Sequence, residues 1–145
     1  MSRAHLGDNP VINAARRKVF LWHESFCQRG VRILIADDQK TVGTTLAALV
    51  CHCKHEVVEV VASGLEAIQA YQRHKPDVVL MDYWMSKLNG VTACRNILAT
   101  DPKARIILFS GFALGRDGTD AGAIAVLSKP VDLRLLEEAL EAAER

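Results

Sequence analysis

Three features of the sequence predict an α/β fold with a doubly wound, five-stranded parallel sheet. From residue 31 onward, short apolar runs alternate with segments of helical spacing, and the connections between them are short. The first and third of these runs are apolar almost throughout, as expected of strands buried on both faces. The chain has 145 residues, half of them hydrophobic, which is enough for one sizeable core.

The predicted strands are short runs rich in β-branched and other apolar residues, each bounded by polar or turn-forming residues. They are expected at Val31–Ala36, Val57–Val61, Val78–Asp82, Arg105–Phe109 and Ala123–Leu127.

The predicted helices show apolar residues at spacings of three and four. They are expected at Thr41–Cys53, Gly64–His74, Val91–Thr100 and Leu133–Ala143. In the second of them, Leu65, Ile68 and Tyr71 should face the core.

The connection after the fourth strand is irregular. Between Ser110 and Gly122 it has three glycines in eleven residues, and each weakens a helix by roughly 1 kcal/mol relative to alanine. Only Phe112–Arg116 has a composition that could form a turn or so. We therefore expect the fourth helix of the (βα)5 pattern to be shortened, frayed or absent.

Charge distribution separates the first thirty residues from the rest. Residues 1–30 carry a net charge of +3 and residues 31–145 a net charge of −2. We therefore expect an N-terminal extension, 1–30, followed by the main domain, 31–145.

The residue pattern of this extension predicts an amphipathic helix, with Asn9 as N-cap and Pro10 at the first helical position. Its apolar face would consist of Ile12, Ala15, Val19, Trp22 and Phe26. This face could pack on the main domain, pair with a second copy in a homodimer, or dock to another protein. A membrane surface is a further, less favoured partner.

Composition argues against several classes of partner. The net charge of +1 gives no reason to expect nucleic acid, and no apolar run reaches the roughly 20 residues that a membrane span requires. No signal peptide is evident, so the four cysteines are read as reduced thiols in a cytoplasmic protein. Cys51, His52 and Cys53 lack the spacing of a structural zinc site.

Polar residues follow four of the predicted strands. Asp37 and Asp38 follow the first, Asp82 ends the third, Ser110 follows the fourth and Lys129 follows the fifth. In a parallel sheet these ends lie along one edge, which is where ligands bind in open α/β folds.

Three carboxylates this close would repel one another unless a cation lies between them. Mg2+ suits such a site, because it is often bound by a few carboxylates together with waters and phosphate oxygens. A lysine and a hydroxyl nearby would complete a site for a transferring phosphoryl group, with a carboxylate as nucleophile.

The pattern resembles the receiver domain of bacterial two-component response regulators, from residue 31 to about 144. The matching residues are Asp37-Asp38, Asp82, Met85 with Asn89-Gly90, Ser110, and Lys129-Pro130. The resemblance implies a flavodoxin-like (βα)5 fold and a signalling domain that catalyses only its own phosphorylation and dephosphorylation.

The resemblance also implies a role for each site residue. Asp82 would accept the phosphoryl group, and Lys129 and Ser110 would contact its oxygens. Asp38, Asp82 and the backbone carbonyl of Trp84 would bind Mg2+, with Asp37 acting mainly through a metal-bound water. The Lys129-Pro130 bond would be cis, and Asp37 could also serve as N-cap of the following helix.

Two positions depart from the family pattern. Ser86 stands where a proline is usual, and Val126 stands where the family usually has an aromatic residue that swings inward on activation. The stiff valine side chain cannot report the movement in that way.

The resulting interpretation is a stand-alone receiver, since no effector domain follows Arg145. It would take a phosphoryl group from a sensor histidine kinase or a histidine phosphotransfer protein and act on an unknown effector protein. Alternatives are a phosphate shuttle or sink in a phosphorelay and a phosphorylation-independent scaffold. A flavodoxin-like cofactor binder is disfavoured, because no glycine-rich phosphate loop follows the first strand.

Overall fold

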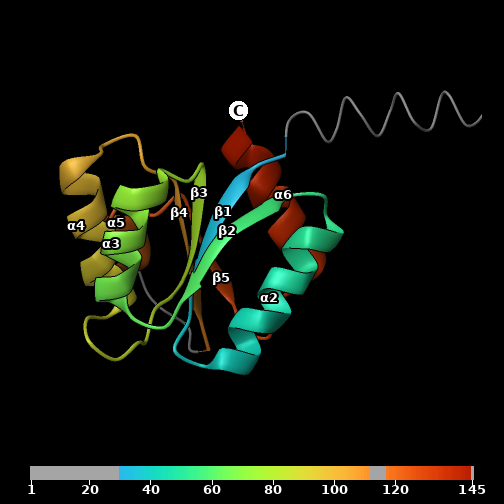
Figure 1. Ribbon diagram of the computed structural model, residues 1–145, viewed down its shortest axis with the longest axis horizontal. Coiled ribbons are helices and arrows are strands. Elements are labelled where there is room, and N and C mark those ends of the chain that lie inside the picture. Colours follow the sequence, from blue (N-terminus) through green and yellow to red (C-terminus); the bar gives the residue numbers. More distant parts are fainter. Residues whose placement is uncertain (1–29, 112–116, 145) are drawn as a thin grey trace, which may run out of the picture. The chain divides into compact units, whose positions relative to one another are not determined.

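The computed structural model describes residues 30–111 and 117–144. The predicted N-terminal helix and the segment Phe112–Arg116 lie outside the described residues. Strands and helices alternate along the described part of the chain (Figure 1). In order they are β1 Arg32–Ala36, α2 Lys40–His52, β2 Glu56–Val61, α3 Gly64–His74, β3 Val78–Asp82, α4 Gly90–Thr100, β4 Ile106–Ser110, α5 Asp117–Asp120, β5 Ala125–Ser128 and α6 Leu133–Glu144.

The five strands form one parallel sheet in the order β2-β1-β3-β4-β5. This confirms the predicted doubly wound, flavodoxin-like architecture. Every residue of β3 and β4 is buried, whereas the edge strand β2 is largely half-exposed. The apolar run of β3 therefore belongs to a strand covered on both faces.

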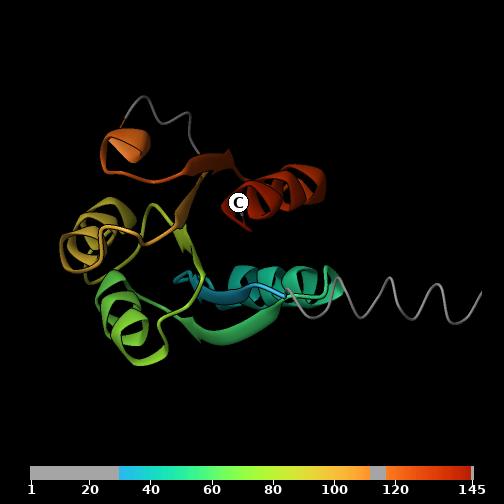
Figure 2. The ribbon, with the colours of Figure 1, turned by 90° about the horizontal axis from the view of Figure 1, so that it is seen from above.

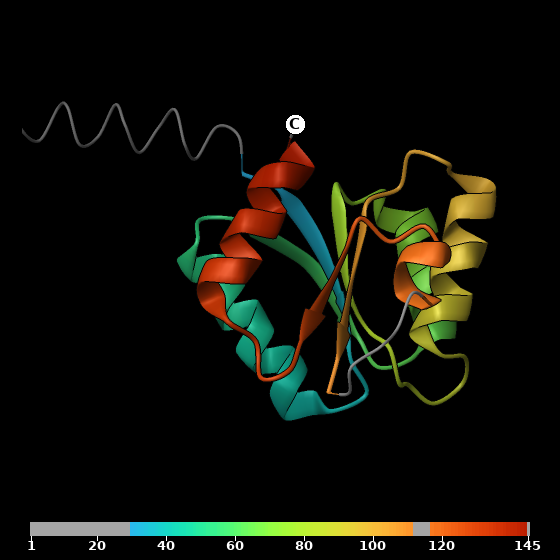
Figure 3. The same cartoon turned by 180° about the vertical axis from the view of Figure 1, so that it is seen from behind.

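Helices cover both faces of the sheet, as Figures 2 and 3 show. α2 and α6 lie on one face, and α3, α4 and α5 lie on the other. Alternate residues of β1 supply the two cores: Ile33 and Ile35 face α2 and α6, while Leu34 and Ala36 face α3 and α4.

The fourth helix of the pattern is short, as predicted: within the described residues, α5 spans Asp117–Asp120. The prediction that only Phe112–Arg116 could form a helical turn is wrong, because this helix lies after that segment. The fifth strand begins two residues later and ends one residue later than predicted, because the chain is still turning at Gly122, which has a φ of +99°. Pairing with β4 starts only where Ala125 lies opposite Ile107.

The prediction that Leu65 faces the core is wrong. Its side chain is 49% exposed, while Ala67, Ala70 and Tyr71 form the buried side of α3. Leu65 lies in the first turn of the helix, where its backbone N–H donates to the carbonyl of Lys87, 3.2 Å away in the loop after β3.

Among the described residues, no helix has the length and apolarity needed to cross a membrane.

Candidate functional site

The carboxyl ends of the strands meet at the lower edge of the sheet in Figure 1. Asp37 follows β1, Asp82 is the last residue of β3, and Ser110 is the last residue of β4. Ser110 lies opposite Ser128 in β5, and Lys129 follows directly. The strand register thus brings together residues that lie far apart in the sequence.

Three carboxylates form a compact cluster at this edge. Asp37, Asp38 and Asp82 each place an oxygen within 4.8 Å of the others. Asp37 is 2% exposed and Asp82 7% exposed, whereas Asp38 is open to solvent. Within the described ranges, this is the only group of three or more acidic, histidine or cysteine side chains spaced to hold a metal. An all-oxygen set with one accessible member fits a hard divalent cation such as Mg2+.

Lys129 lies between two of these carboxylates. Its Nζ is 2.9 Å from Asp37 Oδ2 and 3.1 Å from Asp82 Oδ1. The backbone N–H of Lys129 donates to the carbonyl of Ser110 at 2.8 Å, and the Lys129-Pro130 bond is cis, as predicted. Burial alone would lower the pKa of Lys129, but its hydrogen bonds and attraction to Asp37 and Asp82 give a net increase.

The environment of Asp82 opposes its ionisation. Burial raises its pKa above the ordinary value, and the charge of Asp37 adds to that effect. Lys129 and the backbone N–H of Trp84 act in the opposite direction without cancelling it. An additional cation would therefore stabilise the charged form of Asp82.

Asp37 is not the N-cap of α2. That position belongs to Gln39, whose side chain makes no capping bond. Asp37 Oδ1 instead accepts a hydrogen bond from the Gln39 backbone N–H at 2.8 Å, forming a local turn. One oxygen of Asp37 is thus held by the backbone and the other by Lys129.

The loop from Tyr83 to Asn89 follows Asp82 directly. The Trp84 side chain is 56% exposed and its ring meets Tyr83 edge-on, with ring centroids 4.7 Å apart. Gly90, at the start of α4, donates its N–H to the Tyr83 carbonyl at 2.8 Å. A Cβ at Gly90 would overlap the backbone carbonyl of Asp82, so the tight return of the chain requires glycine.

The remaining predicted positions are also placed by the sheet. Ser110 is 1% exposed at the end of β4. Val126 on β5 packs, half-buried, into the core under α3 and α4. The roles that the resemblance assigns to Ser110, Lys129, Trp84 and the three aspartates stay predictions.

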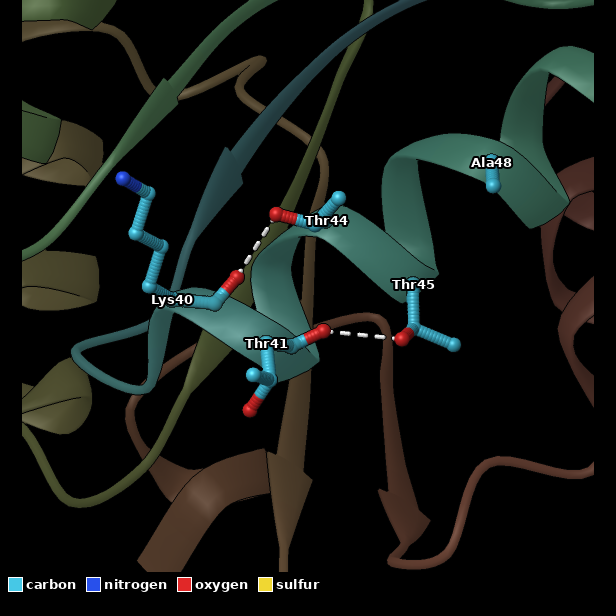
Figure 4. Close-up of a pocket in the computed structure, with 5 residues that line it drawn as sticks. All are labelled: Lys40, Thr41, Thr44, Thr45 and Ala48. Atoms are coloured by element: carbon cyan, nitrogen blue, oxygen red, sulfur yellow. Dashed lines mark hydrogen bonds between the residues drawn. The ribbon is translucent and has the colours of Figure 1, made fainter.

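Two hollows lie against α2, and one of them reaches the carboxylate cluster. One, of about 400 Å3, lies between α2 and β2 and includes Asp37 and Asp38 in its wall. The other, of about 550 Å3, runs along the outer side of α2 (Figure 4). Its two central hydroxyls, Thr44 and Thr45, bond back to helix carbonyls at 2.8 Å, so this surface offers few free polar groups.

Sequence reasoning missed the first turn of α3, which touches the loop after β3. Leu65 bonds to Lys87, and Gly64 lies against Leu88. A signal was present, because Ser63 and Glu66 have the spacing of a helix-start capping pair. The pattern locates the start of the helix, but it does not say which loop the helix meets.

Known proteins resemble this chain over the same region. The model of the response regulator receiver domain family matches residues 33–141. Chemotaxis protein CheY of Thermotoga maritima is 34% identical over 114 residues, which are 77% of this chain and 95% of that protein.

Solved structures agree in fold. A chain of the CheX-CheY-BeF3-Mg complex from Borrelia burgdorferi is similar with a TM-score of 0.74 and 26% identity, over 77% of this chain and 87% of that chain. The receiver domain of a sensor histidine kinase from Pseudomonas aeruginosa, with a magnesium ion coordinated in its active-site cleft, has a TM-score of 0.73 and 28% identity. That alignment covers 79% of this chain and 98% of that one.

Proposed function

Because this chain belongs to the response regulator receiver domain family, we propose that it accepts a phosphoryl group on Asp82 and signals through protein contacts. The donor is the phosphohistidine of a sensor histidine kinase or of a histidine phosphotransfer protein. The domain extends over residues 31–145, and residues 1–30 are an addition to it. The protein is not an enzyme acting on other substrates, but it catalyses its own phosphorylation and dephosphorylation.

The proposed transfer joins one Asp82 carboxylate oxygen to phosphorus. As this bond forms, the bond between phosphorus and the histidine nitrogen breaks, and its electron pair returns to the imidazole. Lys129 lies 3.1 Å from Asp82 and can neutralise charge on the transferring group. Ser110, at the end of the neighbouring strand, is assigned a hydrogen bond to a phosphoryl oxygen.

Mg2+ is the proposed cofactor. Asp38, Asp82 and the carbonyl of Trp84 would hold it, with Asp37 acting through a bound water. When bound, the ion would offset the repulsion among the carboxylates and the incoming phosphate. Support comes from the compact carboxylate cluster and from the raised pKa of Asp82, which is caused first by burial.

One observation carries the proposal: a buried carboxylate at a strand end, flanked by two more carboxylates and touched by a lysine. Acetyl phosphate with Mg2+ should add one phosphoryl group to the full chain, as measured by intact mass spectrometry. Asp82→Asn should abolish the addition, whereas Asp120→Asn, on the exposed helix α5, should leave it unchanged. Uptake by the Asp82→Asn variant would contradict the assignment.

The face of α2 beside the site is the proposed contact for the phosphate donor. α2 begins at Lys40, three residues after Asp37, and its outer surface carries the small side chains of Thr41, Thr44 and Ala48 (Figure 4). A donor histidine must reach Asp82, so the donor protein has to cover the adjoining surface. Small side chains there allow the backbone of a partner helix to approach closely.

We further propose a stand-alone, cytoplasmic receiver. The 95% coverage of the Thermotoga chemotaxis protein supports the first point. A terminal switch and a phosphate shuttle differ in what phosphorylated Asp82 does next. Radiolabelled protein mixed with a histidine phosphotransfer protein should keep its label if it is a switch and lose it rapidly if it is a shuttle. A scaffold would not become labelled at all.

The helix predicted in residues 9–30 is proposed as a contact with a protein partner or with a second copy of the chain. Sedimentation of the full chain, with and without phosphorylation, distinguishes the two. A dimer that is lost when Trp22 and Phe26 are both replaced by alanine would support pairing through this helix. Persistence of the dimer in that variant would rule it out.

A further inference from the structure

The loop that joins β3 to α4 holds two consecutive residues in an unfavourable backbone conformation. Lys87 has a φ of +50° and Leu88 a φ of +93°, although neither is glycine. Each such residue costs roughly 1–3 kcal/mol and persists only where its surroundings impose it. The loop must therefore be held from outside.

The two ends of the loop are fixed on the site itself. At the start, the backbone N–H of Trp84 bonds to the Asp82 carboxylate. At the end, Gly90 donates to the Tyr83 carbonyl at 2.8 Å and lies against the backbone of Asp82. These contacts close the base of the loop, but they do not reach Lys87 or Leu88 at its tip.

The tip is held by the first turn of α3. The Leu65 N–H donates to the Lys87 carbonyl at 3.2 Å. A Cβ on Gly64 would overlap the Leu88 carbonyl, so the two backbones are in direct contact. Met85 buries the first part of the loop in the core, whereas Leu88 at the tip and Leu65 on α3 are 36% and 49% exposed, so the contact at the tip is made mainly by the backbones.

The first turn of α3 is itself firmly anchored. Ser63 is 3% exposed and its hydroxyl accepts from the Glu66 N–H at 3.2 Å. The Glu66 carboxylate accepts from the Ala62 N–H at 2.9 Å, which completes a reciprocal cap. Ala62 directly follows β2, so the clamp is tied to the sheet and not only to the loop.

We propose that Gly64 and the Leu65 amide form a clamp that positions the loop of the phosphorylation site. The clamp holds Lys87 and Leu88 in their left-handed conformations and thereby keeps the Trp84 backbone beside Asp82. Gly64 and Leu65 are positioning residues, since neither touches the metal or the phosphoryl group. This inference rests on the proposed function, because its effect is felt through the Mg2+ site.

The direct test is Gly64→Ala in the full chain with Trp22→Phe, which leaves Trp84 as the one tryptophan. Mg2+ affinity, read from Trp84 fluorescence, should fall about tenfold, as is typical when a supporting residue of a metal site is lost. Without metal, the fluorescence anisotropy of Trp84 should fall, because the loop moves more freely. The matched control is Gly43→Ala in α2, whose new methyl group meets the end of the Val60 side chain at 3.1 Å and is at ordinary contact distance, 4.0 Å, from Asp37 Cβ, with no backbone atom in its way.

Thermal unfolding separates positioning from a general loss of structure. A lower Tm with unchanged Mg2+ affinity and unchanged Trp84 anisotropy would overturn the clamp and leave the proposed function standing. Absence of Mg2+ binding in the reference chain, which carries Trp22→Phe and keeps Gly64, would count against the proposed function itself.

A second measurement needs no substitution at the clamp and covers the case in which Gly64→Ala does not fold. If the clamp and the metal site are coupled, Mg2+ must stabilise the Leu65 to Lys87 bond by the same free energy by which the bond stabilises metal binding. Amide hydrogen exchange at Leu65 should therefore slow several-fold with Mg2+. The Leu136 N–H, bonded to Asp132 in the first turn of α6, is the control. Equal slowing at both amides, or none at Leu65, would overturn the clamp.

Discussion

Two clusters of charged side chains, one at the carboxyl ends of the strands and one on the edge strand β2, make similar contacts with opposite effects on a carboxyl pKa. At the carboxyl edge, Lys129 touches Asp37 and Asp82 at 2.9 and 3.1 Å. On the edge strand β2, the Glu59 carboxylate contacts Arg73 and His74 of α3, both at 2.8 Å. Yet the pKa of Asp82 is raised, whereas the pKa of Glu59 is lowered.

Burial accounts for the difference. Asp82 is nearly enclosed, and loss of water outweighs the attraction of Lys129. The Glu59 side chain keeps 34% of its surface exposed, so the hydrogen bond from Arg73 decides the direction. The ionised Asp82 therefore lowers the stability of the folded protein, as expected of a reactive site. The ionised Glu59 raises it.

Lys129→Met should have the largest effect on stability, because it leaves two buried carboxylates without their shared cation. We expect a loss of about 3–5 kcal/mol at pH 7. The loss should shrink on acidification, as Asp82 takes up a proton. Urea unfolding of the metal-free protein at pH 7 and pH 5 measures both effects. The matched change Arg73→Met removes the exposed partner of Glu59 and should cost less than about 1 kcal/mol. Equal losses of stability in the two variants would contradict the conclusion that burial makes the two clusters differ.

Asp82→Asn should stabilise the metal-free protein, because it removes a carboxylate whose charge is opposed by burial, while Lys129 keeps its contact with Asp37. A carboxyl group whose folded pKa lies above its unfolded value favours folding at low pH and opposes it once the pH has risen through the folded pKa. The asparagine variant escapes this penalty. Its advantage in chemical unfolding should therefore be present at pH 7 and disappear below the ordinary aspartate pKa of 3.8. A variant that is less stable than the wild type at pH 7 would show that attraction to Lys129 exceeds the cost of burial.

Arg32→Met tests the amino edge of the sheet. Arg32 Nη1 donates to the carbonyls of His74 and Lys75, at 2.9 and 3.2 Å. It thereby binds the end of α3, where Lys75 takes a left-handed conformation in place of glycine. We expect a loss of about 1–1.5 kcal/mol in urea unfolding, with Mg2+ affinity unchanged. A change in Mg2+ affinity would mean that the two edges are coupled.

Glu59→Gln should have the smallest effect, a loss of about 0.5 kcal/mol at pH 7, because the pair is exposed to solvent and salt. A lowered folded pKa adds stability above the unfolded pKa and loses it as the pH falls through the folded value. The difference between wild type and variant should therefore fade below about pH 4.5, the ordinary pKa of this group. A difference that persists at pH 3 would assign the effect to packing.

The sequence predicted most of the fold because the central strands are buried on both faces and can be recognised as apolar runs. β3 illustrates this, since its predicted and observed bounds agree at Val78–Asp82. β5 was misplaced by up to two residues, because the left-handed turn at Gly122 postpones its pairing with β4. The exposure of Leu65 could not be predicted, since helical spacing does not reveal that a loop meets the first turn.

By itself the sequence determined the order of strands and helices and the polar residue at each strand end, since local periodicity encodes both. Only the tertiary structure decided that Lys129 lies between Asp37 and Asp82, that burial raises the pKa of Asp82, and that Gly64 touches Leu88. These properties depend on distances between residues far apart in the chain and on the removal of water. Both arise only when the sheet and its helices pack together.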